Sequence, residues 1–158
     1  KLDVIFVTVG THNPPFDRLI KWMDEIAGRL AEPVVIQIGS ATYTPACAQS
    51  FRFCSSDELQ QWVLQSRAVV THGGASIREI LLTGRPAIVV PRLAKFREVV
   101  NDHQVELAEA LARRGLITLA NDLPSLEQAL RDPELPVGQP QSAGQLIHAL
   151  RKILEQFA

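Results

Sequence analysis

Two glycines, Gly73 and Gly74, separate a short apolar run from the predicted start of a helix at Ala75 or Ser76. The run, residues 68–70, is typical of a strand that is buried on both faces. Glycines let the backbone turn sharply and leave no Cβ between the backbone and a ligand. The first amides of a helix have no intrahelical partner and lie at the positive end of the helix dipole. The turn therefore predicts a site for an anion such as a diphosphate, although turns of this kind also occur without a ligand.

A polar segment after the next strand supports this prediction. Residues 87–91, AIVVP, predict a second buried strand, and the segment PRLAKFREVVNDHQ, residues 91–104, follows it. That segment is too long and too polar for a minimal connection, and long ordered loops are often functional. It leaves the carboxyl end of a strand, the edge where open α/β sheets bind ligands. Arg92, Lys95 and Arg97 are expected either to lie in a solvated loop or to attract an anionic donor or partner.

The helix after the glycines has one apolar face. Ile77, Ile80 and Leu81 lie three and four residues apart, the spacing at which side chains share one face of a helix. Glu79 cannot lie on that face, so its carboxylate is expected to be either solvated or in contact with a ligand. Gly84 is predicted to end the helix in a left-handed conformation.

The composition is that of an ordinary globular protein. The chain has 158 residues, of which 46% are hydrophobic and 21% charged, and its net charge of −1 excludes a nucleic-acid binder that relies on bulk positive charge. The apolar run Val4–Val9 is too short for a signal peptide or a membrane helix and predicts a first strand. Cys47 and Cys54 form no metal-binding pattern. Their spacing allows a disulfide, but the lack of a signal peptide favours reduced thiols in the cytoplasm.

Strands and helices alternate, which predicts an α/β fold: a Rossmann-like, doubly wound parallel sheet of about six strands in one domain, residues 1–158. The expected strand order is 3-2-1-4-5-6, which places the first strand beside the fourth. Gly10 and Thr11 would then lie with Gly73 and Gly74 at one crevice on the carboxyl edge. The predicted strands span residues 4–9, 34–39, 51–54, 68–70, 87–91 and 116–119. The predicted helices span about residues 16–30, 56–66, 75–83, 102–114, 123–131 and 142–157.

The first turn does not match an NAD-binding fingerprint. That fingerprint places the pattern G-x-G-x-x-G after the first strand and an acidic residue about 20 positions further on. Here the turn Gly10–Asn13 has one glycine, and the second strand ends in Gly39 and Ser40 rather than in an acidic residue. An NAD-dependent enzyme is therefore not expected.

Two longer stretches carry a family resemblance. They are FVTVGTHNPPFDRLI, residues 6–20, and VTHGGASIREILLTGRPAIVVPRLAKFREVVNDHQVELAEALARRG, residues 70–115. Both resemble the C-terminal, donor-binding half of glycosyltransferase family 28. Within that family they are most similar to the small catalytic subunits of split enzymes, the dolichol-linked N-acetylglucosaminyltransferase and bacterial exopolysaccharide glucuronosyltransferases. The resemblance covers nearly the whole chain and is unspecific only after about residue 120.

The resemblance implies one half of a GT-B fold, the C-terminal type, and a set of substrate-binding residues. In relatives, the diphosphate of the donor lies against the glycine turn and the loop after the first strand. A glutamate on the next helix binds the ribose, and an Asp-Gln region contacts the sugar. The matching residues are Gly10, Thr11, Gly73, Gly74, Ala75 and Ser76 for the diphosphate, Glu79 for the ribose, and Asp102 and Gln104 for the sugar. His72, next to the turn, and Arg92, as a partner for a glucuronate carboxylate, complete the candidate site.

Several of these residues have a structural alternative. Glu79 could be a solvated helix residue, Gln104 could serve only as part of a helix N-terminus, and Asp102 could cap that helix. His72 could be packed below the turn. A glucuronate donor could also be held by Lys95 or Arg97, whereas N-acetylglucosamine needs no cationic partner.

The resemblance further implies the donor-binding catalytic subunit of a two-subunit glycosyltransferase. It would move N-acetylglucosamine or glucuronate from a UDP-sugar to a polyprenyl-diphosphate-linked acceptor at the inner, cytoplasmic face of the membrane. A membrane-anchored, acceptor-binding partner subunit would supply the catalytic base, and the last predicted helix could pack either on its own sheet or against that partner. The sequence has no Asp-x-Asp motif, so neither a metal nor a cofactor beyond the donor substrate is expected.

Two other functions would suit the same fold. A non-catalytic UDP-sugar-binding module, with a sensing or scaffold role, would share the binding site and lack turnover. A UDP-sugar epimerase is not expected, because such an enzyme would carry a second domain that 158 residues do not accommodate.

Overall fold

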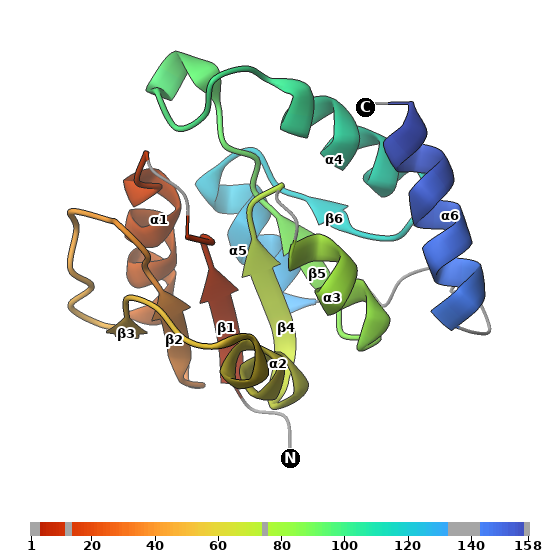
Figure 1. Cartoon of the computed structure of the whole chain (residues 1–158). Helices are drawn as coiled ribbons and strands as arrows, with labels where there is room; N and C mark the ends of the chain where they lie inside the picture. Colours follow the sequence, from red (N-terminus) through yellow and green to blue (C-terminus); the bar gives the residue numbers. More distant parts are fainter. Residues whose placement is uncertain (1–3, 12–13, 74–75, 133–142, 157–158) are drawn as a thin grey trace.

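The computed structural model describes residues 4–11, 14–73, 76–132 and 143–156. Within these ranges, six strands form one parallel sheet in the order β3-β2-β1-β4-β5-β6, with helices on both faces (Figure 1). The predicted fold class and strand order are confirmed. The strands are β1 (Val4–Thr8), β2 (Val34–Gln37), β3 (Gln49–Phe51), β4 (Ser66–Thr71), β5 (Ala87–Val89) and β6 (Thr118–Leu119).

The two faces of the sheet are covered by different helices. The helices in the described ranges are α1 (Asp17–Ala27), α2 (Ser56–Leu64), α3 (Ser76–Leu82), α4 (His103–Arg113), α5 (Leu123–Arg131) and α6 (Ala143–Glu155), with a 3-10 helix, η1 (Ala94–Phe96). Successive side chains of a strand point to opposite faces. In β1, Ile5 and Val7 therefore join a buried cluster with α1 and α5, whereas Phe6 joins a second cluster with α2, α3, α4 and α6.

The helix after the glycine turn has the amphipathic character that the sequence predicts. Ile77, Ile80 and Leu81 on α3 are buried, and Glu79 is exposed. Gly84 follows the helix with a φ of 75°, the left-handed conformation expected of a helix-ending glycine. The α3 side of the sheet is thus built as expected, and Glu79 lies outside its core.

Strand lengths differ from the sequence-based expectation where pairing decides them. β4 begins at Ser66 rather than at residue 68, because β1 pairs with it from Val4 onward. β3 covers residues 49–51 rather than 51–54, since its pairing with β2 ends where Phe51 lies opposite Gln37. Hydrogen bonding to a neighbouring strand is a tertiary property, which a residue's own propensity does not report.

Helix ends differ from expectation in a similar way. α1 ends at Ala27, three residues before the predicted end at residue 30. α2 ends at Leu64, two residues before the predicted end at residue 66, and its N-cap is Ser55, whose side chain accepts a hydrogen bond from the amide of Glu58. Such shifts of one to three residues are usual at helix ends, where the last turns fray.

The last helix completes the core of its own sheet. Leu150 and Ile153 of α6 are buried in the cluster that includes α3 and α4. The side chains of Leu146 and Leu154, and the whole of Phe157, lie outside the described residues. Packing on the home sheet is therefore shown for α6, and a partner contact stays a prediction. In the ranges that the structure describes, no helix is both long enough and apolar enough to cross a membrane.

Candidate functional site

The turn after β1 and the end of β4 pack directly against each other. β1 and β4 are parallel neighbours, with Thr8 opposite Thr71, so the segments that follow the two strands leave the sheet at the same edge. Gly10 has a φ of 76°, and a Cβ added to it would lie 2.7 Å from Nε2 of the buried His72. A side chain at this position would displace His72 and would be strained at this φ, so glycine is strongly favoured. The expected meeting of the two turns at the carboxyl edge is thus observed.

The glycine turn also meets the start of α4. A Cβ added to Gly73 would lie 3.1 Å from the Cβ of Gln104 and 3.3 Å from its carbonyl oxygen. Oε1 of Gln104 is buried and has no hydrogen-bond partner within the described part of the chain. Buried polar atoms are nearly always hydrogen-bonded. Oε1 of Gln104 is therefore suited to accept a hydrogen bond from a ligand beside the turn.

Other members of the predicted diphosphate group are only partly described. Thr11 is exposed at the edge of the sheet. Gly74 and Ala75 lie outside the described residues, and α3 begins at Ser76, directly after them. The structure therefore brings Gly10, His72, Gly73 and Gln104 together and leaves the contribution of the remaining turn residues as a prediction.

Glu79 lies on the solvent side of α3, next to a cavity between α2 and α3. Its carboxylate is 3.7 Å from Nη1 of Arg78, a distance that gives little stabilisation between exposed groups. Glu79 also lines a cavity of about 640 Å³ between α2 and α3, opposite Asp57 and Gln60. Its side chain is thus accessible to a ligand and contributes no packing.

Arg92 is a buried residue of the loop after β5 and does not lie in a solvated loop. Its Nη1 donates to the carbonyl oxygens of Pro14 (2.6 Å) and Glu98 (3.1 Å), and its Nη2 donates to that of Val9 (2.8 Å). The guanidinium also lies 4.9 Å from the ring centre of Phe16. Burial lowers the pKa of Arg92, and the nearby Glu98 carboxylate opposes this effect. In this structure the guanidinium of Arg92 binds backbone carbonyls of the segments after β1 and β5.

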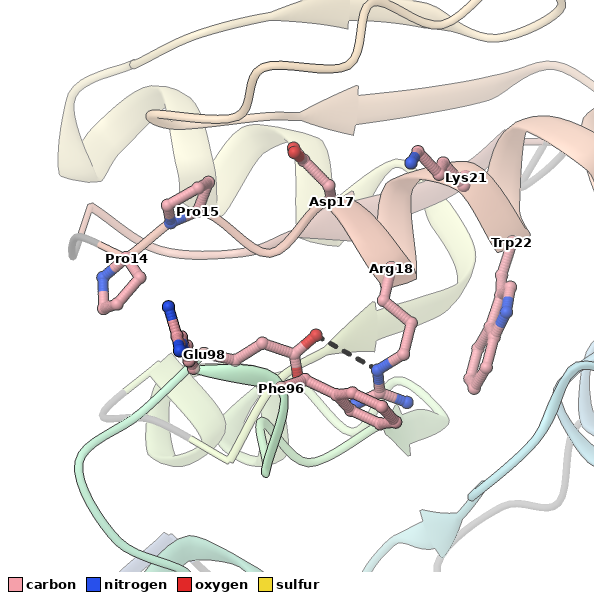
Figure 2. A pocket seen from close by; sticks show the side chains of 9 residues that line it. Pro14, Pro15, Asp17, Arg18, Lys21, Trp22, Phe96 and Glu98 are labelled. Carbon is pink, nitrogen blue, oxygen red and sulfur yellow. Dashed lines mark hydrogen bonds and ion pairs between the residues drawn. The ribbon is translucent and has the colours of Figure 1, made fainter. Parts of the chain in front are cut away.

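A buried ion pair between Arg18 and Glu98 joins α1 to the loop after β5. Glu98 is 5% exposed and accepts hydrogen bonds from Nε (3.1 Å) and Nη2 (2.9 Å) of Arg18, whose guanidinium lies near the rings of Trp22 and Phe96 at 4.8 and 5.1 Å. Figure 2 shows this pair at the side of a cavity of about 590 Å³ between α1 and the loop. Because α1 and the loop are joined in this way, η1 and its neighbours are held in place.

The cationic and acidic residues of this loop have separate roles. Lys95 and Arg97 are exposed, and within the described residues neither forms an ion pair with a carboxylate. Asp102 occupies the position before α4, but its carboxylate accepts from the amide of Ala94 at 2.9 Å and does not cap the helix. The capping alternative for Asp102 is therefore wrong. Its carboxylate instead binds the first residue of η1, in the loop after β5.

One buried polar residue at this edge, Gln37, is not among the site residues that the sequence predicts. Gln37, at the end of β2, is 3% exposed and hydrogen-bonds to both the amide and the carbonyl of Gly10. The position of Gln37 inside the apolar run VVIQIG could have marked it, because a buried side-chain amide needs hydrogen-bond partners.

No metal centre is evident in the part of the chain that the structure describes, where no three His, Cys, Asp or Glu side chains are grouped closely enough to hold an ion. Cys47 and Cys54 are both free thiols. The site consists instead of two glycine turns, a buried histidine and an amide side chain. Such groups bind anions and hydroxyl groups through hydrogen bonds.

Comparison with known proteins agrees with this geometry. The glycosyltransferase family 28 C-terminal domain matches residues 4–156, whereas the search of curated proteins found no match. The solved structures that share the fold include the following three. The glycotransferase of kitacinnamycin has a TM-score of 0.63 at 23% identity, ALG13 has 0.62 at 16%, and MurG of Acinetobacter baumannii has 0.62 at 18%.

The length that is shared differs among these structures. The alignments cover 98%, 96% and 95% of this chain for the kitacinnamycin enzyme, MurG and ALG13, in that order. They cover 39% of the kitacinnamycin enzyme, 50% of MurG and 96% of ALG13. Identities this low show a common fold, whereas the family match extends over nearly all residues. On that match, the chain belongs to the glycosyltransferase family 28 C-terminal domain family.

Proposed function

We propose that the chain binds the nucleotide of a UDP-sugar and acts as the donor-binding part of a glycosyltransferase. The observation that carries this proposal is the meeting of Gly10, His72, Gly73 and Gln104 at the carboxyl edge of the sheet, in a chain of this family. Backbone without Cβ atoms lets a diphosphate approach closely, and the adjoining N-terminus of α3 favours negative charge.

The roles of the individual residues follow from their chemistry. Amides of the glycine turn and the exposed Thr11 would stabilise the charge that develops on the departing nucleotide. Glu79 would accept hydrogen bonds from the two ribose hydroxyls, and the Gln104 amide would contact the sugar. Asp102 is the second proposed sugar contact, through the carboxylate oxygen that Ala94 does not use.

The donor sugar and the acceptor belong to the same proposal. The sugar would be N-acetylglucosamine or glucuronate, and the acceptor a polyprenyl-diphosphate-linked glycan at the cytoplasmic face of the membrane. Because Arg92 is engaged with three carbonyls, a glucuronate carboxylate would be held by Lys95 or Arg97, which are exposed. A membrane-anchored partner would bind the acceptor and supply the base that activates its hydroxyl.

Calorimetric titration with UDP tests the proposed donor site. The chain is expected to bind UDP with a dissociation constant of about 1 mM or tighter, and a chelator should leave the affinity unchanged, because the proposed contacts are backbone amides and side chains. GDP serves as the control for base selectivity. Absence of UDP binding at millimolar concentration, both for the chain alone and for the chain with its partner, would show that the site is wrongly assigned.

The substitution Glu79→Ala separates ligand binding from stability. We expect UDP affinity to fall by roughly tenfold, the usual effect of losing hydrogen bonds to a charged group. The melting temperature should change by no more than about 2 °C, because exposed side chains contribute little to stability. Glu109→Ala, at an exposed position of α4, is the matched control and should alter neither quantity. A much lower melting temperature with unchanged UDP affinity would make Glu79 a structural residue.

A further inference from the structure

We propose that Gln37 is a positioning residue, which holds the turn after β1 in the conformation that receives the diphosphate. This role rests on the proposed function, since it concerns the same donor site. Gln37 would act through Gly10 and Thr11 and would not touch the donor. The evidence is a set of hydrogen bonds that joins β1, β2 and the residue after β3 at the carboxyl edge.

The amide of Gln37 uses its full hydrogen-bonding capacity. Oε1 accepts from Oγ1 of Thr8 at 2.6 Å and from the amide of Gly10 at 3.2 Å. Nε2 donates to the carbonyl oxygens of Gly10 at 3.1 Å and Arg52 at 2.7 Å. A carboxamide has two acceptor sites and two donor hydrogens, so no capacity is left for a ligand. With 3% of its surface exposed, Gln37 can affect the donor only through the groups that it holds.

Gly10 is the residue that this arrangement restrains. Both of its backbone polar groups are bound by one side chain, and it has a φ of 76°. Glycine is the residue with the most conformational freedom, so its position depends on external contacts more than that of other residues. Bonds to both its amide and its carbonyl select one orientation of the turn.

Neighbouring groups enclose the same turn from other sides. The carbonyl of Val9 accepts from Arg92 at 2.8 Å. A Cβ added to Gly39 would lie 2.8 Å from the carbonyl oxygen of Gly10, and His72, the residue after β4, lies against Gly10. The turn is therefore held from β2, the residue after β4 and the loop after β5 at once, and a group held before the ligand arrives costs less entropy to bind.

The consequence for the site is the direction of the next residue. Thr11 follows Gly10 directly and is exposed at the edge of the sheet, where its amide and hydroxyl can meet a phosphate. Loss of the Gln37 amide frees the turn and lets Thr11 point elsewhere. The affinity contributed by the diphosphate should fall, whereas the affinity contributed by the nucleoside should stay.

Titrations with UDP and with uridine, followed by NMR on the 15N-labelled chain, separate these contributions and report folding in the same spectra. The wild-type chain should bind UDP more tightly than uridine. In Gln37→Leu the ratio of the two affinities is expected to fall roughly tenfold, as when hydrogen bonds to a charged group are lost, with uridine affinity unchanged. Gln49→Leu, at an exposed position of β3, is the matched control and should keep the wild-type ratio.

If Gln37→Leu does not fold, two milder variants at Thr8 test whether Gln37 positions the turn. Thr8→Val removes the hydroxyl that donates to Oε1 of Gln37 and that also accepts from the amide of Gly10 at 3.4 Å, and it should reduce the ratio by about threefold. Thr8→Ser keeps a hydroxyl and should retain most of the ratio. Wild-type chain that binds UDP no better than uridine would overturn the proposed function and this role with it. A clear wild-type preference that persists in Thr8→Val and in any folded Gln37→Leu would overturn the role of Gln37 alone.

Discussion

The chain by itself is expected to transfer sugar from its UDP-sugar donor to a polyprenyl-diphosphate acceptor about 10²- to 10⁴-fold more slowly than the chain combined with an acceptor-binding partner. That factor is the usual contribution of a positioned general base, which the proposal assigns to the partner. Release of UDP from UDP-N-acetylglucosamine or UDP-glucuronate, with and without partner and acceptor, measures it.

The structural reason for this expectation is that several proposed donor-binding residues at the carboxyl edge of the sheet are open to solvent. Thr11, Glu79 and Asp102 are all exposed in the structure, so water would reach the sugar and hydrolysis would compete with transfer. The chain aligns with 39% of the kitacinnamycin enzyme and 50% of MurG, whereas it covers 96% of ALG13. A unit of this size thus occurs both inside longer chains and as a chain of similar length.

Three outcomes of this assay have different meanings. Robust transfer by the isolated chain would overturn the dependence on a partner. Transfer only in the combined sample would support it, and hydrolysis by the isolated chain serves as the control for donor binding without an acceptor. UDP binding with no transfer in either sample would favour the non-catalytic sensing or scaffold role.

Replacement of Arg92 by methionine is expected to lower the free energy of unfolding by about 3–5 kcal/mol, because two buried carbonyls and one partly buried carbonyl lose a charged donor and methionine offers none. The carbonyls belong to Val9, Pro14 and Glu98, so the loss would loosen the loops after β1 and β5 together. Urea denaturation of the wild-type and variant chains measures the difference. Arg92→Lys, which keeps the charge but only part of the geometry, should recover a fraction of the stability.

Arg97→Met is the matched control for this measurement. Arg97 is exposed, and in the described part of the chain no carboxylate pairs with it, so the same substitution should change the unfolding free energy by no more than about 0.5 kcal/mol. An Arg92→Met chain with wild-type stability and strongly reduced affinity for a glucuronate donor would instead make Arg92 a ligand contact, the role first expected of it.

The positions of the strands along the chain could be predicted because each strand depends on a local pattern, and their order then followed from the topology that such alternating elements favour. Buried strands need continuous apolar runs, and Val4–Val9 and residues 68–70 supply two of them. Glycine is needed at Gly73, where the backbone approaches Gln104, and at Gly84, where it is left-handed. α3 lies between these two glycines, as predicted. Family resemblance then assigned chemical roles that periodicity alone does not specify.

Side-chain partners could not be predicted in the same way. Arg92 and Arg97 lie five residues apart in one polar segment, yet the first is buried on three carbonyls and the second is exposed. Asp102 has the sequence context of a helix cap but binds the amide of Ala94. These outcomes depend on which distant backbone groups lack partners after the sheet has formed.

The sequence by itself therefore determined the alternation of strands and helices, the glycine positions and the family, since all three are properties of nearest neighbours or of short motifs. Only the tertiary structure decided that Gln37 and Arg92 hold the turn at Gly10, from positions 27 and 82 residues further along the chain. The physical reason is that a buried polar group must find a partner wherever the packed sheet provides one. These partners come from different strands, so the pairing produces no periodic pattern in the sequence.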